Sequence, residues 1–259
     1  PEETLGKTIE FFQPFVTSGQ VDALGIGCFG PLDLDPASPT YGYITSTPKP
    51  DWSNTDVRGI IQHALNVNVA FDMDVNAAAL GELTWGASQG CDPSLYLTIG
   101  TGIGGGYIVN GKPLTGLLAL EMGHIRIPHD PLLDPFRGNC PFHRDCFEGL
   151  ASGPAIQKRF GSRGESMRDD DPFWDMEAAY IAAALVNYIL TLSPRKIVLG
   201  GGVMQREFLF PMVRRKVQEL LNGYVIHPSL LKKIKEYIVP PGLGSRSGSL
   251  GAIVLAQMA

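Results

Sequence analysis

Four short apolar segments, each leading into glycine or ending in an acidic residue, constrain the fold of this chain most strongly. They lie at residues 23–28, 67–74, 94–99 and 196–200. Amphipathic patterns alternate with them, and in the longest one, residues 175–192, apolar side chains recur at alternating spacings of four and three. Strands that alternate with helices predict an α/β fold, and two blocks rich in strands predict two domains with a cleft. Because ligands of open α/β sheets bind at the carboxyl ends of strands, we expect the chemistry there.

The overall composition disfavours several classes of function. The chain has 259 residues and a formal net charge of −5, without a run of lysine and arginine, so nucleic acid is not an expected partner. No apolar stretch reaches about 18 residues, and we expect the Ala-rich segment 178–192 to be a core or interface helix, with no membrane partner. A cytoplasmic protein is expected, although a sequence that begins at Pro1 does not test for a targeting segment.

A glycine-rich loop follows the third apolar segment. Its spacing matches G-x-G-x-x-G at Gly100, Gly102 and Gly105. A dinucleotide site of that pattern requires a helix directly after the glycines, whereas residues 107–109 favour a strand and Asn110-Gly111 favours a hairpin turn. The backbone N–H groups of such a loop form an anion-binding nest, so we predict a site for nucleotide phosphates, with a purely structural hairpin as the alternative.

A second glycine cluster, Gly200 to Gly202, stands between an apolar strand and a helical pattern. Backbone without side chains allows a flat ring to approach closely, which suits adenosine; a tight strand-to-helix turn explains the cluster equally well.

Asp74 ends the second apolar segment, immediately before a helical pattern. A carboxylate there serves either as an N-cap of the helix or as a general base toward a hydroxyl substrate. Asp72 points to the same side of the strand, where it either supports Asp74 or repels it.

A cluster of cysteine and histidine lies between residues 121 and 149. Cys140, His143 and Cys146 have the spacing C-x2-H-x2-C, which suits one Zn²⁺ ion held by two thiolates and imidazole. We choose His124 as the fourth ligand, because a tight turn after "EMG" can aim it inward, and expect His129 to be exposed. Four protein ligands make a closed site, so the zinc is expected to be structural.

Together these motifs resemble the ROK family of sugar kinases and related repressors, within the actin-like ATPase superfamily. The matching segments occur in the family's order: "GIGCFGPLD", "DMDVNAAALGE", "TIGTGIGGG", "EMGH", "CFEGLASGPA" and "LGGGVM". The Cys/His spacing and the segment "YGYITSTPKPDW" are most similar to the bacterial fructokinase branch.

The resemblance implies a two-domain actin-like ATPase (ribonuclease H-like) fold with a cleft. Residues 1–75 with 248–259 are the expected small domain on the sugar side, and residues 76–247 the large domain with the glycine loop, the zinc loop and the adenosine side. The family opens with a D-x-G-G-T-K-like hairpin that contacts ATP, whereas this sequence begins "PEETLGKTIE". The small domain is therefore expected to lack its first strands.

The resemblance also implies roles for individual residues. Asp74 corresponds to the base that deprotonates the sugar hydroxyl for attack on the γ-phosphate of ATP. The implied sugar contacts are Gly30, Pro31, Glu121, His124 and Glu148. The implied nucleotide contacts are Gly100, Thr101, Gly102 and Gly104 for the phosphates and Gly200, Gly201 and Gly202 for adenosine, with Mg²⁺ accompanying ATP. Met73 replaces the family's usual asparagine before the base, so sugar recognition is expected to differ in detail.

The expected activity is ATP-dependent phosphorylation of a hexose, most of all fructose to fructose 6-phosphate, by a homodimer. A sugar-binding repressor or a non-catalytic sugar sensor of the same family is the alternative. Repressors carry a helix-turn-helix domain, and "PEETLGKTIEFFQPF" shows no basic pair of helices. An NAD-dependent oxidoreductase is disfavoured by the hairpin after the glycines.

Overall fold

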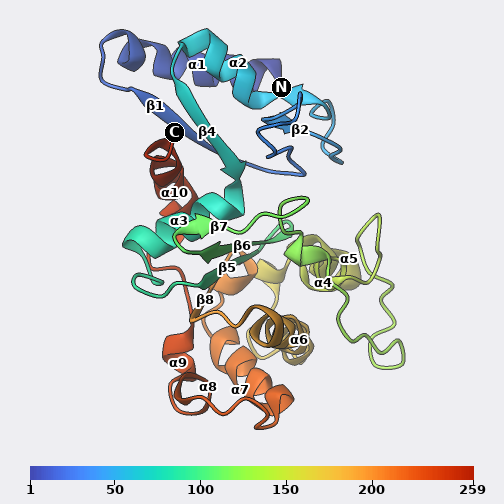
Figure 1. Cartoon of the computed structure of the whole chain (residues 1–259). Coiled ribbons are helices and arrows are strands. Elements are labelled where there is room, and N and C mark those ends of the chain that lie inside the picture. Colours follow the sequence, from blue (N-terminus) through green and yellow to red (C-terminus); the bar gives the residue numbers. More distant parts are fainter.

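The computed structural model describes residues 1–259. A first group of elements, at the top of Figure 1, surrounds a two-stranded parallel sheet. Its strands are β1 (Ala23–Cys28) and β4 (Asn68–Met73), which pair in parallel, and β2 (Tyr43–Ile44) and β3 (Thr55–Asp56), which form an antiparallel ribbon. Its helices are α1 (Glu2–Thr17) and α2 (Val57–Leu65). Apolar side chains from both helices and both parallel strands form one core, which includes Leu5, Leu24, Ile61 and Val69.

The second group contains a five-stranded mixed sheet in the order β7-β6-β5-β8-β9. Its strands are β5 (Ser94–Ile99), β6 (Ile103–Val109), β7 (Lys112–Pro113), β8 (Lys196–Gly200) and β9 (Ile238–Val239). Strand β5 pairs with β6 in antiparallel and with β8 in parallel fashion.

Helices cover both faces of this sheet, because side chains of a strand alternate between its faces. Leu95 and Leu97 of β5 join the core formed with α6 and α7, whereas Tyr96 joins the core formed with α3 and α10. The helices are α3 (Asp74–Trp85), α4 (Phe147–Ala151), α5 (Gly153–Phe160), α6 (Phe173–Leu192), α7 (Leu209–Leu221), α8 (Pro228–Leu231), α9 (Ile234–Tyr237) and α10 (Ser247–Ala256).

The C-terminal helix α10 connects the two groups. It packs against α3 beside the large sheet and also against β1 of the first group (Figure 1). Glycines allow this close approach: a Cβ on Gly251 would lie 1.6 Å from the carbonyl oxygen of Ala77, and one on Gly25 would lie 1.9 Å from that of Ala252. The domain boundaries expected from the sequence stay a prediction.

Helix α6 is the one helix that is long and apolar enough, by length and composition alone, to cross a membrane. The sequence analysis did not count it as such a stretch. Half of its apolar window is buried, and its side chains pack in the core with α7 and the sheet. This packing is that of a core helix, as expected for residues 178–192.

Candidate active site

A cleft of about 1680 Å³ lies where the two groups of elements face each other. Residues from β4, the β5–β6 hairpin, the segment before α4 and the turn after β8 line it. Among the residues predicted to bind sugar or nucleotide, those on its wall are Gly30, Pro31, Asp74, Gly100, Thr101, Gly102, Gly104, Glu121, His124, Glu148, Gly201 and Gly202. Segments far apart in the sequence therefore meet at one cavity.

Asp74 is the first residue of α3, at the carboxyl end of β4, and its side chain opens into the cleft. The N-cap position belongs to Met73, so Asp74 is not the N-cap. Its Oδ1 accepts a hydrogen bond of 2.8 Å from the backbone N–H of Val75. The surrounding protein displaces water and raises the pKa of Asp74, while the Val75 N–H and the positive charge of Lys49 act in the opposite direction.

Asp72 does not share the site of Asp74. Its Oδ1 accepts hydrogen bonds from the side-chain amide of Asn76, at 2.6 Å, and from the backbone N–H of Met73, at 2.7 Å. Its carboxylate therefore holds the start of α3 together.

The glycine loop connects two antiparallel strands, which confirms the hairpin and leaves no helix for a dinucleotide site. Gly100 lies beside the second glycine cluster, because a Cβ on it would be 3.6 Å from the backbone nitrogen of Gly202. Gly201 has a φ of +90° and its backbone crosses close to Ile99. Gly200 does not line the cleft: a Cβ there would meet the hydroxyl of Tyr96 at 2.6 Å. The turn, rather than its first glycine, faces the cavity.

Glu121, His124 and Glu148 lie close together on the wall of the cleft. Glu121 precedes a 3-10 turn, Met122–His124, and Glu148 belongs to α4. Burial raises the pKa of Glu121, His124 lowers it and the charge of Glu148 raises it further, so the three groups influence one another. Glu148 has a second task that the sequence did not predict: its Oε2 accepts a 2.8 Å hydrogen bond from the Ile103 N–H and so supports the glycine hairpin.

The four predicted metal ligands meet at one point. One donor atom from each of His124, Cys140, His143 and Cys146 lies within 4.8 Å of the others. The Nδ1 atom of His124 is 3.8 Å from the Cys140 sulfur and 3.6 Å from the Cys146 sulfur, and His143 Nδ1 is 3.6 Å from the Cys140 sulfur. Tetrahedral zinc bonds of about 2.0 to 2.3 Å give edges of about 3.5 Å, so the donor set fits Zn²⁺.

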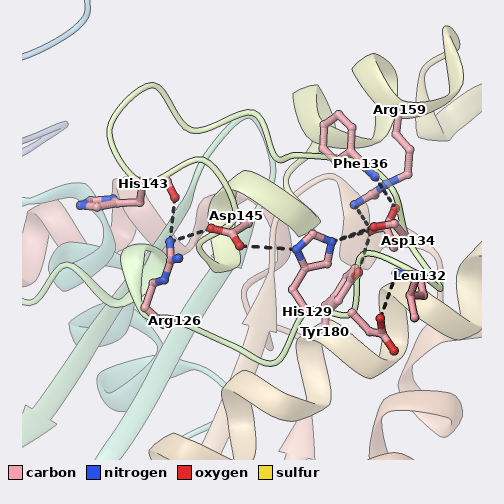
Figure 2. A network of polar contacts seen from close by, with 10 residues as sticks. Arg126, His129, Leu132, Asp134, Phe136, His143, Asp145, Arg159 and Tyr180 are labelled. Atoms are coloured by element: carbon pink, nitrogen blue, oxygen red, sulfur yellow. Dashed lines mark hydrogen bonds and ion pairs between the residues drawn. The ribbon is translucent and has the colours of Figure 1, made fainter.

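His129 is the histidine that the sequence analysis placed wrongly. It is not exposed: 8% of its side chain is accessible, because its ring lies between two polar groups (Figure 2). Its Nε2 is 2.9 Å from the carbonyl oxygen of Asp134 and its Nδ1 is 3.4 Å from the carboxylate of Asp145. Its contacts with Asp134 and with the distant Asp145 thus keep the ring of His129 away from solvent.

The same contacts attach the Cys/His loop to the core. Asp134 accepts hydrogen bonds from Arg159 of α5, at 2.9 Å, and from the Tyr180 hydroxyl of α6, at 2.7 Å. At the other end of the row, Arg126 pairs with Asp145 and donates to the carbonyl oxygen of His143, both at 2.7 Å (Figure 2). A continuous polar row therefore joins α5 and α6 to a predicted metal ligand.

Comparison with known proteins identifies the family. The profile of the ROK family matches residues 1–259. The chain belongs to the ROK family. It is 46% identical over 266 residues to the fructokinase of Zymomonas mobilis, covering 100% of this chain and 86% of that one. It is 44% identical over 259 residues to the fructokinase of Pediococcus pentosaceus, covering 100% and 88%.

The fold of this ROK protein is that of solved sugar kinases. The crystal structure of the ROK hexokinase from Thermus thermophilus has a TM-score of 0.80 and 28% identity, and the match covers 100% of this chain and 87% of that one. The predicted α/β fold of the ROK sugar kinases is therefore confirmed.

Several cleft residues of this ROK protein were missed by the sequence analysis, notably Lys49, Trp174 and Arg206. The guanidinium of Arg206 lies 4.9 Å from the centre of the Trp174 ring and donates a 2.7 Å hydrogen bond to the carbonyl oxygen of Gly164. Arg206 follows the second glycine cluster by four positions, which is the one signal that could have drawn attention to it. Lys49 stands between two prolines in the segment "YGYITSTPKPDW", which the sequence analysis used only for its similarity to fructokinases.

Proposed function

We propose that this ROK protein transfers the γ-phosphoryl group of ATP to fructose and produces fructose 6-phosphate. The position of Asp74 carries the proposal, because its carboxylate opens into the cleft between Gly30-Pro31 and the glycine hairpin. Identity of 44% and 46% over the whole chain to two bacterial fructokinases supports fructose as the acceptor.

Asp74 serves as the general base. Its carboxylate takes the proton of the sugar hydroxyl while the hydroxyl oxygen attacks the γ-phosphorus, and the bond from that phosphorus to its bridging oxygen breaks as ADP leaves. The raised pKa keeps the carboxylate a useful proton acceptor near neutral pH, and the Val75 N–H keeps it oriented.

The glycine loops bind the nucleotide in this proposal. The loop of residues 100–104 faces the phosphates and offers them the backbone N–H groups of Thr101 and Gly102, because the N–H of Gly100 donates to Gly102 and that of Ile103 to Glu148. The neighbouring turn at Gly201 and Gly202 admits the adenosine, and Gly200, which faces Tyr96, supports this turn from behind. ATP enters as its Mg²⁺ complex, in which the metal is bound chiefly by phosphate and water oxygens.

The cluster of Glu121, His124 and Glu148 recognises the sugar. Glu121 and Glu148 offer carboxylate oxygens to its hydroxyls, and His124, with Nδ1 turned to the sulfur atoms, keeps Nε2 for the substrate. When zinc is bound by His124, Cys140, His143 and Cys146, it supplies rigidity, because a closed set of four protein ligands leaves no position for hydroxide. The polar row from α5 and α6 holds the same loop from its other side.

A cytoplasmic homodimer completes the proposal. The cytoplasm supplies the ATP that the reaction consumes, and light scattering of the purified protein tests the dimer. The kinase is preferred to a non-catalytic sugar sensor, because a sensor needs no carboxylate placed in the cleft beside the glycine loop.

A coupled assay of ADP release over fructose, mannose, glucose and N-acetylhexosamines tests the proposed function. We expect the highest kcat/KM with fructose. A higher value with another hexose contradicts the acceptor alone, whereas release that does not depend on any sugar contradicts the kinase.

A further inference from the structure

Lys49 lines the cleft but belongs neither to the proposed sugar contacts nor to the proposed nucleotide contacts. It belongs to the segment Ser46–Lys49, between β2 and β3, which lines the cleft on the same side as Gly30 and Asp74. Its ammonium is not among those that form ion pairs in this protein, which are Lys7, Lys216 and Lys233. The cleft therefore contains a lysine whose charge has no carboxylate partner.

An aromatic platform fixes the position of this charge. The Lys49 nitrogen lies 3.3 Å from the centre of the Phe29 ring, which directly precedes the Gly30-Pro31 segment of the sugar side. The ring of Phe29 is held in turn by an edge-on contact with Trp52, at 5.3 Å between ring centres. Prolines at positions 48 and 50 restrict the backbone on both sides of the lysine. The contact with the ring therefore places the ammonium of Lys49, whose side chain is otherwise exposed to solvent.

The charges around Asp74 indicate what such a cation is for. The sugar side of the cleft carries the carboxylates of Asp74, Glu121 and Glu148, and a phosphoryl group must arrive beside them with further negative charge. Of the two arginines on the wall, Arg206 is already committed to Asp169 and to the carbonyl oxygens of Gly164 and Met167, and Arg163 directly precedes Gly164 in the segment that Arg206 holds. Lys49 is the one cation whose field acts on the pKa of Asp74.

We propose that Lys49 binds the phosphoryl group in transit, beside Asp74, and then the phosphate of the sugar phosphate product. The inference rests on the proposed function and extends it by naming the side chain that receives the transferred group. Lys49 stays protonated throughout and donates N–H bonds to the non-bridging oxygens. The sugar oxygen forms the new bond to phosphorus, the bond to the ADP oxygen breaks with its electron pair, and the sugar proton passes to Asp74.

Binding measurements on Lys49→Met and Lys49→Arg test the assignment, with fructose and fructose 6-phosphate as separate ligands in titration calorimetry. We expect Lys49→Met to weaken fructose 6-phosphate binding by at least about 10-fold and to lower kcat by about 10- to 100-fold, which is the range for losing one charged donor to the transition state. Fructose binding stays within about twofold, because the phosphoryl group alone contacts the ammonium in this scheme. Lys49→Arg keeps the charge and restores most of both losses.

Matched variants separate this role from a general effect. Lys112→Met makes the same change at an exposed lysine of β7 outside the cleft, and we expect no change in either binding or kcat. Phe29→Leu leaves Lys49 in place but removes its platform, so it weakens fructose 6-phosphate binding more than fructose binding. An equal loss for both ligands in Lys49→Met means that Lys49 binds the sugar, and no loss means that it binds neither; each result overturns the proposal.

The pH profile gives an independent readout. Lys49 lowers the pKa of Asp74, so Lys49→Met should move the acid limb of kcat/KM to higher pH, and Lys49→Arg should not. The other titratable groups around Asp74 are Cys28, Asp72, Tyr96, Glu121, His124 and Glu148. Burial raises the pKa of Cys28 to about 11 and that of Tyr96 to about 12, so neither titrates on the acid limb. An unchanged limb in Lys49→Met contradicts the placement of the cation beside the base.

The proposed function and this inference fail in different experiments. If the unmodified protein prefers another hexose, the same binding comparison uses that hexose and its 6-phosphate. If it phosphorylates no sugar, the proposed function has failed in the unmodified protein, while inorganic phosphate still shows whether Lys49 binds a phosphoryl group.

Discussion

At the scale of single residues, Asp74 decides whether the cleft is catalytic. Asp74→Asn keeps the shape of the side chain and its hydrogen bond to the Val75 N–H but cannot accept a proton near neutral pH. General bases typically contribute about 10²- to 10⁴-fold, so we expect kcat to fall by at least about 10²-fold. Steady-state kinetics gives this value, and calorimetry should show fructose binding within about twofold of the unmodified protein. Turnover close to normal contradicts the assignment of the base.

A second single-residue prediction concerns Glu177 of α6, which is wholly buried and has no hydrogen-bond partner for either carboxylate oxygen. Burial raises its pKa well above the usual 4.5, although Arg159 acts to lower it. The folded protein then keeps the proton at pH values where the unfolded chain releases it. The free energy of unfolding must therefore fall as pH rises above 4.5, by about 1.4 kcal/mol for each unit of pKa difference.

Glu177→Gln removes this dependence, because glutamine has a similar shape and no charge. Urea unfolding at about pH 5 and about pH 8 measures this difference. The free energy of unfolding of the variant, relative to that of the unmodified protein, should be higher at the higher pH. The same difference at both pH values contradicts a raised pKa for Glu177.

At the scale of elements, the sequence was enough to predict those strands and turns that neighbouring residues alone determine. The strand expected at 23–28 is β1, and the strand after the glycine loop, β6, turns back into β7 at Asn110-Gly111, because such a turn requires positive φ at both positions. Contacts between distant segments were not predictable in this way. The burial of His129 depends on Asp134 and Asp145, and the bond from Glu148 to Ile103 joins residues that no spacing rule connects.

The Cys/His loop supplies the prediction at this scale. Metal analysis should give one zinc per chain, and Cys140→Ser/Cys146→Ser should lose it, because two of the four donors are removed. Hydrogen exchange over residues 121–149 should then accelerate as a unit, and kcat/KM for fructose should fall by about 10- to 100-fold as His124 and the two glutamates lose their positions. Cys91→Ser, outside the loop, serves as the control. A double variant that still binds zinc contradicts the ligand set.

At the scale of the whole molecule, the cleft depends on how the two groups of elements are held together. The pattern of strands and helices predicted two blocks, but it could not predict that α10 returns from the C-terminus to pack on both α3 and β1 (Figure 1). The glycines responsible, Gly25, Gly81 and Gly251, looked like ordinary glycines of a strand and two helices in the sequence. A side chain is excluded at each of them, because each glycine faces the backbone of another element.

Gly251→Ala tests this connection. The added methyl group would lie 1.6 Å from the Ala77 carbonyl oxygen, so α10 must move away from α3. We expect a loss of about 1–3 kcal/mol in the free energy of unfolding, as for other overpacked cores, measured by urea denaturation. Because α3 begins with Asp74, kcat should fall in the folded protein as well.

Gly248→Ala is the matched control for this change, since it adds the same methyl group to the same helix where no atom lies within 4 Å. Alanine favours a helix over glycine by up to about 1 kcal/mol, so this variant should be at least as stable as the unmodified protein, with unchanged kcat. If Gly251→Ala behaves like Gly248→Ala, then α10 and α3 do not approach as closely as described. If Gly251→Ala loses stability but not kcat, the connection stabilises the fold without positioning the base. A loss of both, with the control unchanged, makes α10 the element that sets the position of Asp74 relative to the large sheet.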